Sequence, residues 1–179
     1  MPAIELVELA SFRDFVALSA VRVQPAQRGF TKHWLLTYLQ SRHPAVSTYS
    51  VQVAGDLVGF VMLIHAENPT QWIIERLTID RDHQRQGVGY GVADRLIDMI
   101  HGFENSEMVI ARYDPKNEAA RELFARLNFV EREEMFRGRK IALLEFEFEE
   151  AGDAESDDAD DSDDEIAAAD TDDDDDERG

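Results

Sequence analysis

The sequence predicts an α+β protein with a mixed, mostly antiparallel sheet flanked by helices. Three observations predict it. Runs rich in β-branched and aromatic residues alternate with runs of helical period along residues 3–149. Turn residues separate these runs. Three strand-like runs follow one another before the middle helix, so only one later unit has the strand–helix–strand order of a parallel pair. The expected order is β-α-α-β-β-β-α-β-α-β-β, followed by an acidic C-terminal tail.

The first elements are a strand and two helices. Residues 3–9 form an apolar run typical of a strand, and residues 11–20 predict a short helix. Ser11 is a suitable N-cap with Asp14 at the third helical position, which is the pattern of a capping box. Residues 25–41 begin with proline and carry aromatic residues at helical spacing, which predicts a second helix with its aromatic stripe in the core.

The middle of the chain is predicted to form a hairpin, one further strand and a helix. Residues 47–65 contain two β-rich runs around the turn dipeptide Gly55-Asp56, which predicts a hairpin. Residues 71–80 predict the next strand, and a glycine-rich segment follows it directly. Residues 88–102 have apolar side chains on one helical face, so we expect a helix there.

The last elements complete the sheet. Residues 107–113 predict a short buried strand, and residues 115–128 predict a helix that starts at Pro115. Residues 129–149 predict two strands joined by a turn near Gly138, because alternating apolar and polar residues flank that glycine.

The charge of the chain is concentrated at its C-terminus. The formal net charge is −20, and residues 151–179 hold 16 of the 38 acidic residues with a single arginine. One large apolar residue, Ile166, is too little to offset the ordering entropy of this segment. We therefore expect a folded domain over residues 1–150 and a disordered acidic tail over 151–179. The negative charge disfavours nucleic acid as the main partner.

Composition also bears on the source and the compartment. Lysine occurs three times, against 14 arginines before residue 151, and with the Asp-rich tail this resembles proteins of salt-loving archaea. A GC-rich genome is the alternative source of the arginine bias.

The absence of cysteine excludes disulfides and thiolate chemistry. The N-terminus does not resemble a secretory signal, and no apolar run reaches the roughly 18 residues of a membrane span. We expect a cytoplasmic protein without membrane contact.

The segment DHQRQGVGYGVADRLI, residues 82–97, predicts a phosphate site. Gly87, Gly89 and Gly91 stand where a strand passes into a helix, and free N–H groups at a helix N-terminus attract anions. A dinucleotide fingerprint needs a different glycine spacing, and a P-loop needs a Gly-Lys-Ser/Thr sequence that is absent. The glycine cluster alone does not identify the ligand, and the pyrophosphate of coenzyme A is the third candidate.

Two motifs supply a family resemblance. QRQGVG (84–89) fits the pattern Q/R-x-x-G-x-G/A, and N-x-x-A-x-x-L-F-x-x-x-N-F (117–129) follows the next strand. Together with LTID before the loop, they resemble the GCN5-related N-acetyltransferases, and the element order resembles that family over residues 3–149. The segments VGFVM, WIIERLTID and QGVGYG are most similar to spermine/spermidine (diamine) acetyltransferases.

The resemblance implies acetyl-CoA as co-substrate. Gln84 would brace the loop, and the backbone of Leu77, Thr78 and Ile79 would pair with the pantetheine arm, one N–H polarising the thioester carbonyl. Asn117 would lie near the pantetheine, with a plain helix N-cap as the alternative. The pyrophosphate would be surrounded by backbone N–H groups of Arg85, Gln86, Gly87, Val88, Gly89 and Tyr90.

Direct acetyl transfer requires a base for the amine and an acid for the thiolate. Glu75 matches an acidic position in polyamine acetyltransferases and is our candidate base, acting through water; its alternative is an ion pair with an arginine. The family's usual acid, a tyrosine, is replaced here by Phe124 at the coenzyme site. Tyr113 is the candidate substitute, with a core aromatic or a water molecule as the alternatives. The five histidines show no metal-ligand spacing, so no metal is expected.

The acceptor cannot be assigned consistently from these patterns. The diamine resemblance implies a cationic small-molecule amine, but residues 15–55 hold no Asp or Glu and four basic residues. A protein N-terminus or an amino acid is the alternative acceptor, and a catalytically weak acetyl-CoA-binding protein is the alternative function. The resemblance also implies a possible homodimer formed through the late strands, 129–147.

Overall fold

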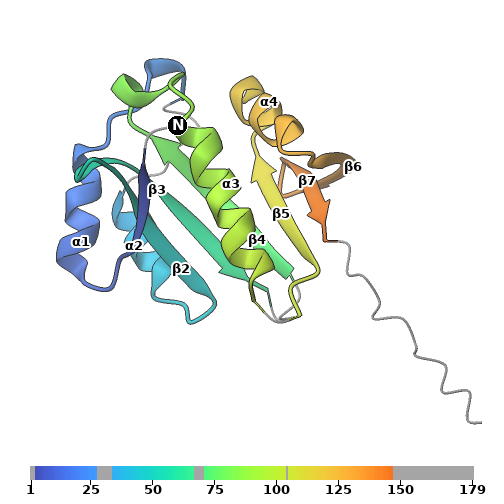
Figure 1. Ribbon diagram of the computed structural model, residues 1–179, viewed down its shortest axis with the longest axis horizontal. Helices are drawn as coiled ribbons and strands as arrows, with labels where there is room; N and C mark the ends of the chain where they lie inside the picture. Colours follow the sequence, from blue (N-terminus) through green and yellow to red (C-terminus); the bar gives the residue numbers. More distant parts are fainter. Residues whose placement is uncertain (1–2, 28–33, 67–70, 104, 147–179) are drawn as a thin grey trace, which may run out of the picture. The chain divides into compact units, whose positions relative to one another are not determined.

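The computed structural model describes residues 3–27, 34–66, 71–103 and 105–146, and every structural statement below concerns these residues (Figure 1). The predicted tail, and with it the boundary at residue 150, lies outside them. The strands form a seven-stranded sheet in the order β1-β2-β3-β4-β5-β7-β6. Their bounds are β1 Ile4–Glu8, β2 Val46–Val53, β3 Asp56–His65, β4 Gln71–Ile79, β5 Met108–Tyr113, β6 Val130–Phe136 and β7 Arg139–Glu145.

The sheet is mixed and mostly antiparallel, as predicted. The pairs β1–β2, β2–β3, β3–β4, β5–β7 and β6–β7 are antiparallel. The pair β4–β5 is parallel, because α3 (Val88–His101) connects the two strands as a crossover. The observed order of helices and strands agrees with the order expected from the sequence.

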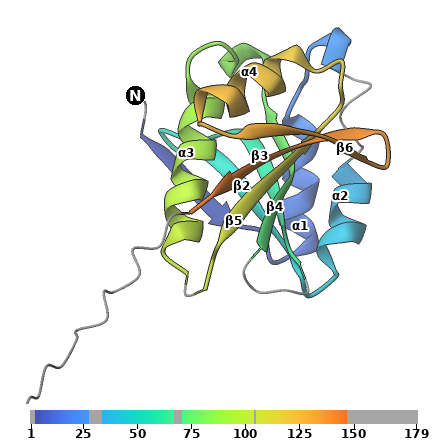
Figure 2. The ribbon, with the colours of Figure 1, turned by 90° about the vertical axis from the view of Figure 1, so that its right-hand side faces the viewer.

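Helices cover both faces of the sheet (Figure 2). α1 (Phe12–Ala17) and α2 (Trp34–Ser41) lie on one face, where Phe15 and Leu18 pack against Phe60 of β3. α3 lies on the opposite face and buries one side of its length in the main core. α4 (Glu118–Arg126) adds Phe124 to the same core. Short 3-10 turns η1 (Leu18–Ala20), η2 (Pro25–Gln27) and η3 (Arg81–His83) complete the described elements.

Local contacts correct two element boundaries. The hairpin turn is Ala54-Gly55, both with positive φ, and Asp56 already belongs to β3, so the predicted Gly55-Asp56 turn was one residue late. α4 begins at Glu118 because the Asn117 side chain caps it, whereas the predicted start was Pro115.

The second helix predicted over residues 25–41 is only partly within the described residues. α2 covers Trp34–Ser41, Pro25–Gln27 forms the separate turn η2, and residues 28–33 lie outside the described part. The first helix has the predicted capping box, since the Ser11 side chain accepts from Asp14 N–H and the Asp14 carboxylate accepts from the Ser11 N–H.

A β-bulge in β4 opens the sheet. Met62 of β3 pairs with Arg76 and the next residue, Leu63, pairs with Ile74, so Glu75 has no partner in the ladder. The pairing of β4 with β5 also ends at Ile74. Beyond the bulge, β5 continues alongside β7, and β4 continues alongside β3. The two parallel strands therefore separate and leave backbone groups of β4 facing a gap.

Candidate functional site

A cavity of about 940 Å³ lies along the opened part of β4. Its walls come from β4, β5, the loop before α3, α4, and the turn between β6 and β7. Most of the sequence-predicted site residues line it. They are Glu75, Leu77, Thr78, Ile79, Gln84, Arg85, Gly87, Gly89, Tyr90, Tyr113, Asn117 and Phe124. The other two do not: Val88 is buried in the core, and Gln86 donates to the Asp82 carbonyl at 2.8 Å.

The loop before α3 presents backbone donors to the cavity. Gly87 is the N-cap residue of α3 in a left-handed conformation, with φ of 81°, and Arg85 also has positive φ. A Cβ atom at Gly87 would meet no protein atom within 4 Å. The first N–H groups of a helix have no intrahelical acceptors, so this end of the cavity suits an anion.

Gln84 and Asp80 fix the position of this loop. The Gln84 amide donates to the Ile79 carbonyl and to Gln27 Oε1, both at 2.8 Å. The Asp80 carboxylate accepts from the N–H groups of Arg22 at 2.7 Å and Asp82 at 3.0 Å. Burial opposes ionisation, but these hydrogen bonds and the Arg22 guanidinium outweigh it, so the pKa of Asp80 is lowered.

The gap exposes alternate backbone groups of β4. Asp80 N–H donates to the Val58 carbonyl at 2.7 Å, which sets the phase of the antiparallel ladder. Thr78 lies two residues earlier and therefore directs its backbone groups toward β3. Leu77 and Ile79 direct theirs toward the gap, although the Ile79 carbonyl is taken by Gln84. A ligand strand in the gap can thus pair with Leu77 and with the Ile79 N–H.

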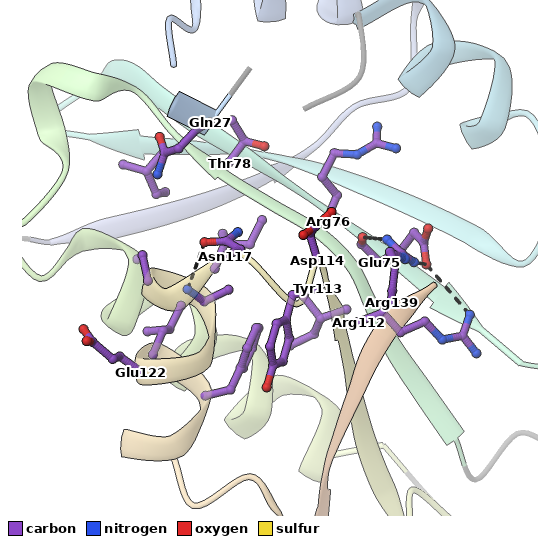
Figure 3. A pocket seen from close by; sticks show the side chains of 18 of the residues that line it. Gln27, Glu75, Arg76, Thr78, Arg112, Tyr113, Asp114, Asn117, Glu122 and Arg139 are labelled. Atoms are coloured by element: carbon purple, nitrogen blue, oxygen red, sulfur yellow. Dashed lines mark hydrogen bonds and ion pairs between the residues drawn. The ribbon is translucent and has the colours of Figure 1, made fainter. Parts of the chain in front are cut away.

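The α4 side of the cavity is closed by aromatic packing. Phe124 is buried and stacks on Tyr113 with ring centroids 5.9 Å apart. The Tyr113 hydroxyl donates to Glu131 at 2.7 Å, and Figure 3 draws it pointing away from Glu75. Burial, together with that hydrogen bond and the negative charge of Glu131, raises the pKa of Tyr113 well above its usual range. Asn117 lines the cavity and also caps α4, accepting from Ala120 N–H at 3.2 Å.

Glu75, at the bulge, is held by two arginines (Figure 3). Its Oε2 atom lies 2.5 Å from Arg139 Nη2 and 3.8 Å from Arg112 Nη1. Arg139 Nη1 also donates to the Glu75 backbone carbonyl at 3.3 Å. The ion pair that was the alternative interpretation of Glu75 therefore exists, and it leaves Oε1 without a described contact.

Sequence reasoning missed several charged residues of the cavity. Asp114 lines it immediately after β5, with Oδ1 accepting from Lys116 N–H at 2.9 Å. Glu122 and Arg126 of α4 also line it, and four further arginines come from β4, β5, the β6–β7 turn and β7, namely Arg76, Arg112, Arg137 and Arg139. Among these arginines, only Arg76 lies next to the predicted residue Glu75 in the sequence. Arg112 and Arg139 come close to Glu75 because β4, β5 and β7 are neighbours in the sheet.

The fold and the site first define a class: an α+β domain with a cleft between two parallel strands that separate at a bulge. The sequence profile of the Acetyltransferase (GNAT) family then matches residues 9–129, and the chain belongs to this family. The family and its structural neighbours are acetyltransferases, and neighbours solved with coenzyme A support acetyl-CoA as co-substrate. No curated protein matches the chain.

Solved structures similar to this chain include enzymes that are named for different acceptors. The spermidine N-acetyltransferase from Vibrio cholerae, in complex with CoA and spermine, is 19% identical with a TM-score of 0.61, covering 78% of this chain and 92% of that one. The ribosomal-protein-S18-alanine N-acetyltransferase from Escherichia coli is 19% identical with a TM-score of 0.64, covering 86% and 98%. At these identities the likeness concerns the fold, and the acceptor has to be argued from the cavity.

None of the helices in the described residues combines the length and apolar character needed to cross a membrane. Within the same ranges, no three His, Cys, Asp or Glu side chains are grouped closely enough to hold a metal ion.

Proposed function

We propose that this protein transfers the acetyl group of acetyl-CoA directly to a primary amine of a small molecule. The observation that carries the proposal is the opening of the sheet at Glu75. It leaves the backbone of Leu77 and the N–H of Ile79 facing a cavity that also reaches the N-terminus of α3. A cavity of this shape accommodates an extended arm with a phosphate group at one end and its reactive end at the bulge.

The residues of the cavity fit coenzyme A. Backbone N–H groups between Arg85 and Tyr90 would hold the pyrophosphate, and the space beside Gly87 admits its oxygen atoms, since no protein atom lies within 4 Å of a Cβ there. Leu77 and Ile79 would pair with the pantetheine arm as an added strand. Thr78, which was predicted with them, would contact the arm through its side chain, because its backbone pairs with β3. When bound, acetyl-CoA supplies an activated acetyl thioester.

Three groups of the chain would promote the transfer. An N–H of Leu77 or Ile79 would donate to the acetyl oxygen as charge develops on it. Glu75 would accept the amine proton through a water molecule on Oε1, while Arg139 holds Oε2. Asp114 is a second candidate base, because it lines the cavity and forms no ion pair with a described residue.

The proton that returns to sulfur needs a different source from the family's usual one. Phe124 has no proton to give. The Tyr113 hydroxyl already donates to Glu131, and its raised pKa makes it a poor acid. Of the alternatives predicted from the sequence, we favour water, with Tyr113 as a packing partner of Phe124.

The experiment is an assay of acetyl-CoA-dependent thiol release with diamines, amino acids and peptides as acceptors. Turnover of at least one amine, with the acetyl group recovered on its nitrogen, is the expected result. Binding of acetyl-CoA without turnover of any acceptor would support the second candidate, a catalytically weak acetyl-CoA-binding protein. The observation that favours this alternative is the phenylalanine at position 124.

A cytoplasmic homodimer is the remaining part of the proposal. β6 is an edge strand whose seven residues are all exposed, and its apolar side chains include Val130 and Met135. Such an edge can pair with a second copy. Sedimentation of the full chain at several concentrations tests this expectation, and a monomer throughout would contradict it.

A further inference from the structure

Four arginines gather at the bulge end of the cavity, and we call them the arginine cluster: Arg76, Arg112, Arg137 and Arg139. They come from β4, β5, the β6–β7 turn and β7. Figure 3 draws Arg112 and Arg139 beside Glu75, on the opposite side of the view from Gln27, Asn117 and Glu122. These two arginines therefore lie apart from the end of the cavity that α3 and α4 supply.

Carboxylates of the chain neutralise this cluster only in part. Glu75 is shared between Arg139 and Arg112 through a single oxygen. Even if Asp114 is counted as a second negative charge, two of the four positive charges remain uncompensated among the described residues.

The arginines of the cluster make further contacts, and Arg137 is exposed to solvent. Arg76 is buried and donates to neutral oxygens, Thr37 Oγ1 at 2.6 Å and Gln40 Oε1 at 3.1 Å. Arg137 and Arg112 both stack on Phe136, with Cζ 5.2 and 4.0 Å from the ring centroid. The Arg112 Nε atom is buried without a hydrogen-bond partner in the described part of the chain.

The positive charges of the cluster lie close enough to affect one another. Burial lowers the pKa of Arg112; Glu75 opposes this shift, and the positive charges of Arg139 and Arg137 add to it. Arg76 has a lowered pKa for the same first reason, burial. A buried or half-buried charge without a counter-ion is unfavourable, and guanidinium groups bind carboxylates with two parallel hydrogen bonds.

We propose that the arginine cluster binds a carboxylate of the acceptor, so that the substrate is an amine carrying a carboxylate, such as an amino acid. This inference rests on the proposed acetyl transfer, because it assigns the bulge end of the cavity to the acceptor. The coenzyme phosphates have their own donors at the loop before α3. A di- or polyamine would bring further positive charge to the cluster and be repelled. The polyamine acceptor implied by the sequence resemblance is therefore disfavoured.

Matched acceptor pairs test the proposal in the full-length protein. Thiol release from acetyl-CoA is measured with glycine against glycinamide, β-alanine against β-alaninamide, and with putrescine and spermidine. Each pair keeps the amine and replaces the carboxylate by an uncharged group. The amide has the more readily deprotonated amine, so intrinsic reactivity favours it. We expect kcat/KM at least tenfold higher for the carboxylate, and lowest for the polyamines. Equal values within a pair, or preference for spermidine, overturn the proposal.

Substitutions in the arginine cluster test whether it causes the preference for carboxylate acceptors over their amides. Arg137→Gln and Arg112→Gln are expected to reduce the carboxylate-to-amide ratio at least fivefold. Arg132→Gln is the matched control: Arg132 is an exposed residue of β6, pairs with Glu145 at 3.3 Å and does not line the cavity, so the ratio should stay unchanged. If the cluster variants instead raise KM for acetyl-CoA and keep the ratio, the cluster binds the coenzyme and the proposal is wrong.

A binding measurement separates this proposal from the proposed function. Glycine and β-alanine are titrated calorimetrically into the CoA-saturated protein and into its Arg137→Gln and Arg112→Gln variants. Binding that both variants weaken supports the carboxylate site even if no acceptor is turned over, in which case acetyl transfer fails alone. Turnover of spermidine together with no binding of either carboxylate supports acetyl transfer and overturns the carboxylate site.

Dipeptide acceptors test whether the carboxylate belongs to a free amino acid or to a peptide. Glu-Ala and its amide carry their carboxylates at other distances from the N-terminal amine than glycine does. A dipeptide with higher kcat/KM than any free amino acid would assign the cluster to an acidic N-terminal residue. Loss of that activity in Arg137→Gln, with Arg132→Gln unchanged, supports a carboxylate on the acceptor from this second source; activity unaffected by both variants counts against it.

Discussion

Gly87→Ala separates the role of the glycine loop in folding from its role in coenzyme binding. Gly87 has a φ of 81°, and a Cβ there would meet no protein atom within 4 Å, so the substitution adds backbone strain and no clash. The left-handed conformation costs an alanine about 1–2 kcal/mol, and the lower entropy of its unfolded chain returns about 0.4–1 kcal/mol. The expected loss of unfolding free energy is therefore about 1 kcal/mol.

The effect on coenzyme binding is expected to be larger. A methyl group in this space would displace the pyrophosphate from at least one backbone N–H. A hydrogen bond to a charged group contributes about 1.5–3 kcal/mol. The loss of one such bond weakens the Kd for CoA roughly 10- to 100-fold.

Gly55→Ala is the matched control for this experiment. Gly55 has a φ of 85°, also has open space around its Cβ position, and lies in the β2–β3 turn outside the cavity. Urea unfolding should give the same loss of stability for both variants, and calorimetry should give weaker CoA binding for Gly87→Ala alone. If both variants bind CoA with the same Kd, the loop does not hold the pyrophosphate and the reasoning fails.

Three further substitutions test the catalytic assignments and the loop. Tyr113→Phe should leave kcat within about threefold of wild type, because the hydroxyl donates to Glu131; a loss of about 10²-fold or more would make Tyr113 the acid. Glu75→Gln should lower kcat by about 10²-fold or more and Asp114→Asn by far less, whereas the reverse order in steady-state kinetics would move the base to Asp114. Asp80→Asn should destabilise the protein at neutral pH but not at low pH. The pKa of Asp80 is lowered from 3.8, so its stabilisation is present above that value and is lost as the pH falls through the folded pKa. A stability difference between Asp80→Asn and wild type that is the same at pH 7 and at the lowest accessible pH would contradict this.

The element order could be predicted because each element carries its own period. The amphipathic α3 and α4 are clear from apolar spacing, and the Ser11 cap is a local motif with a local cause. Boundaries were less predictable where a side chain competes with a general preference. Asn117 caps α4 two residues after the proline that was expected to start it.

Only those cavity residues that belong to local sequence motifs could be predicted. The glycine loop and the β4 residues after Glu75 are contiguous in sequence, so motif and strand pattern locate them together. The arginine cluster is assembled from four elements, and Arg139 lies 64 residues from the Glu75 that it contacts. No local pattern marks such a pair, because the bulge in β4 and the sheet order bring its members together.

The most direct test of the proposed site is a crystal structure of the full chain with CoA and a carboxylate-bearing amine. We expect the pyrophosphate at the N–H groups of residues 85–90 and the pantetheine along Leu77 and Ile79. The carboxylate should bind the arginine cluster, with the amine between that cluster and the thiol. A pyrophosphate bound to the arginine cluster, or a pantetheine outside the gap between β4 and β5, would show that the site is assigned wrongly.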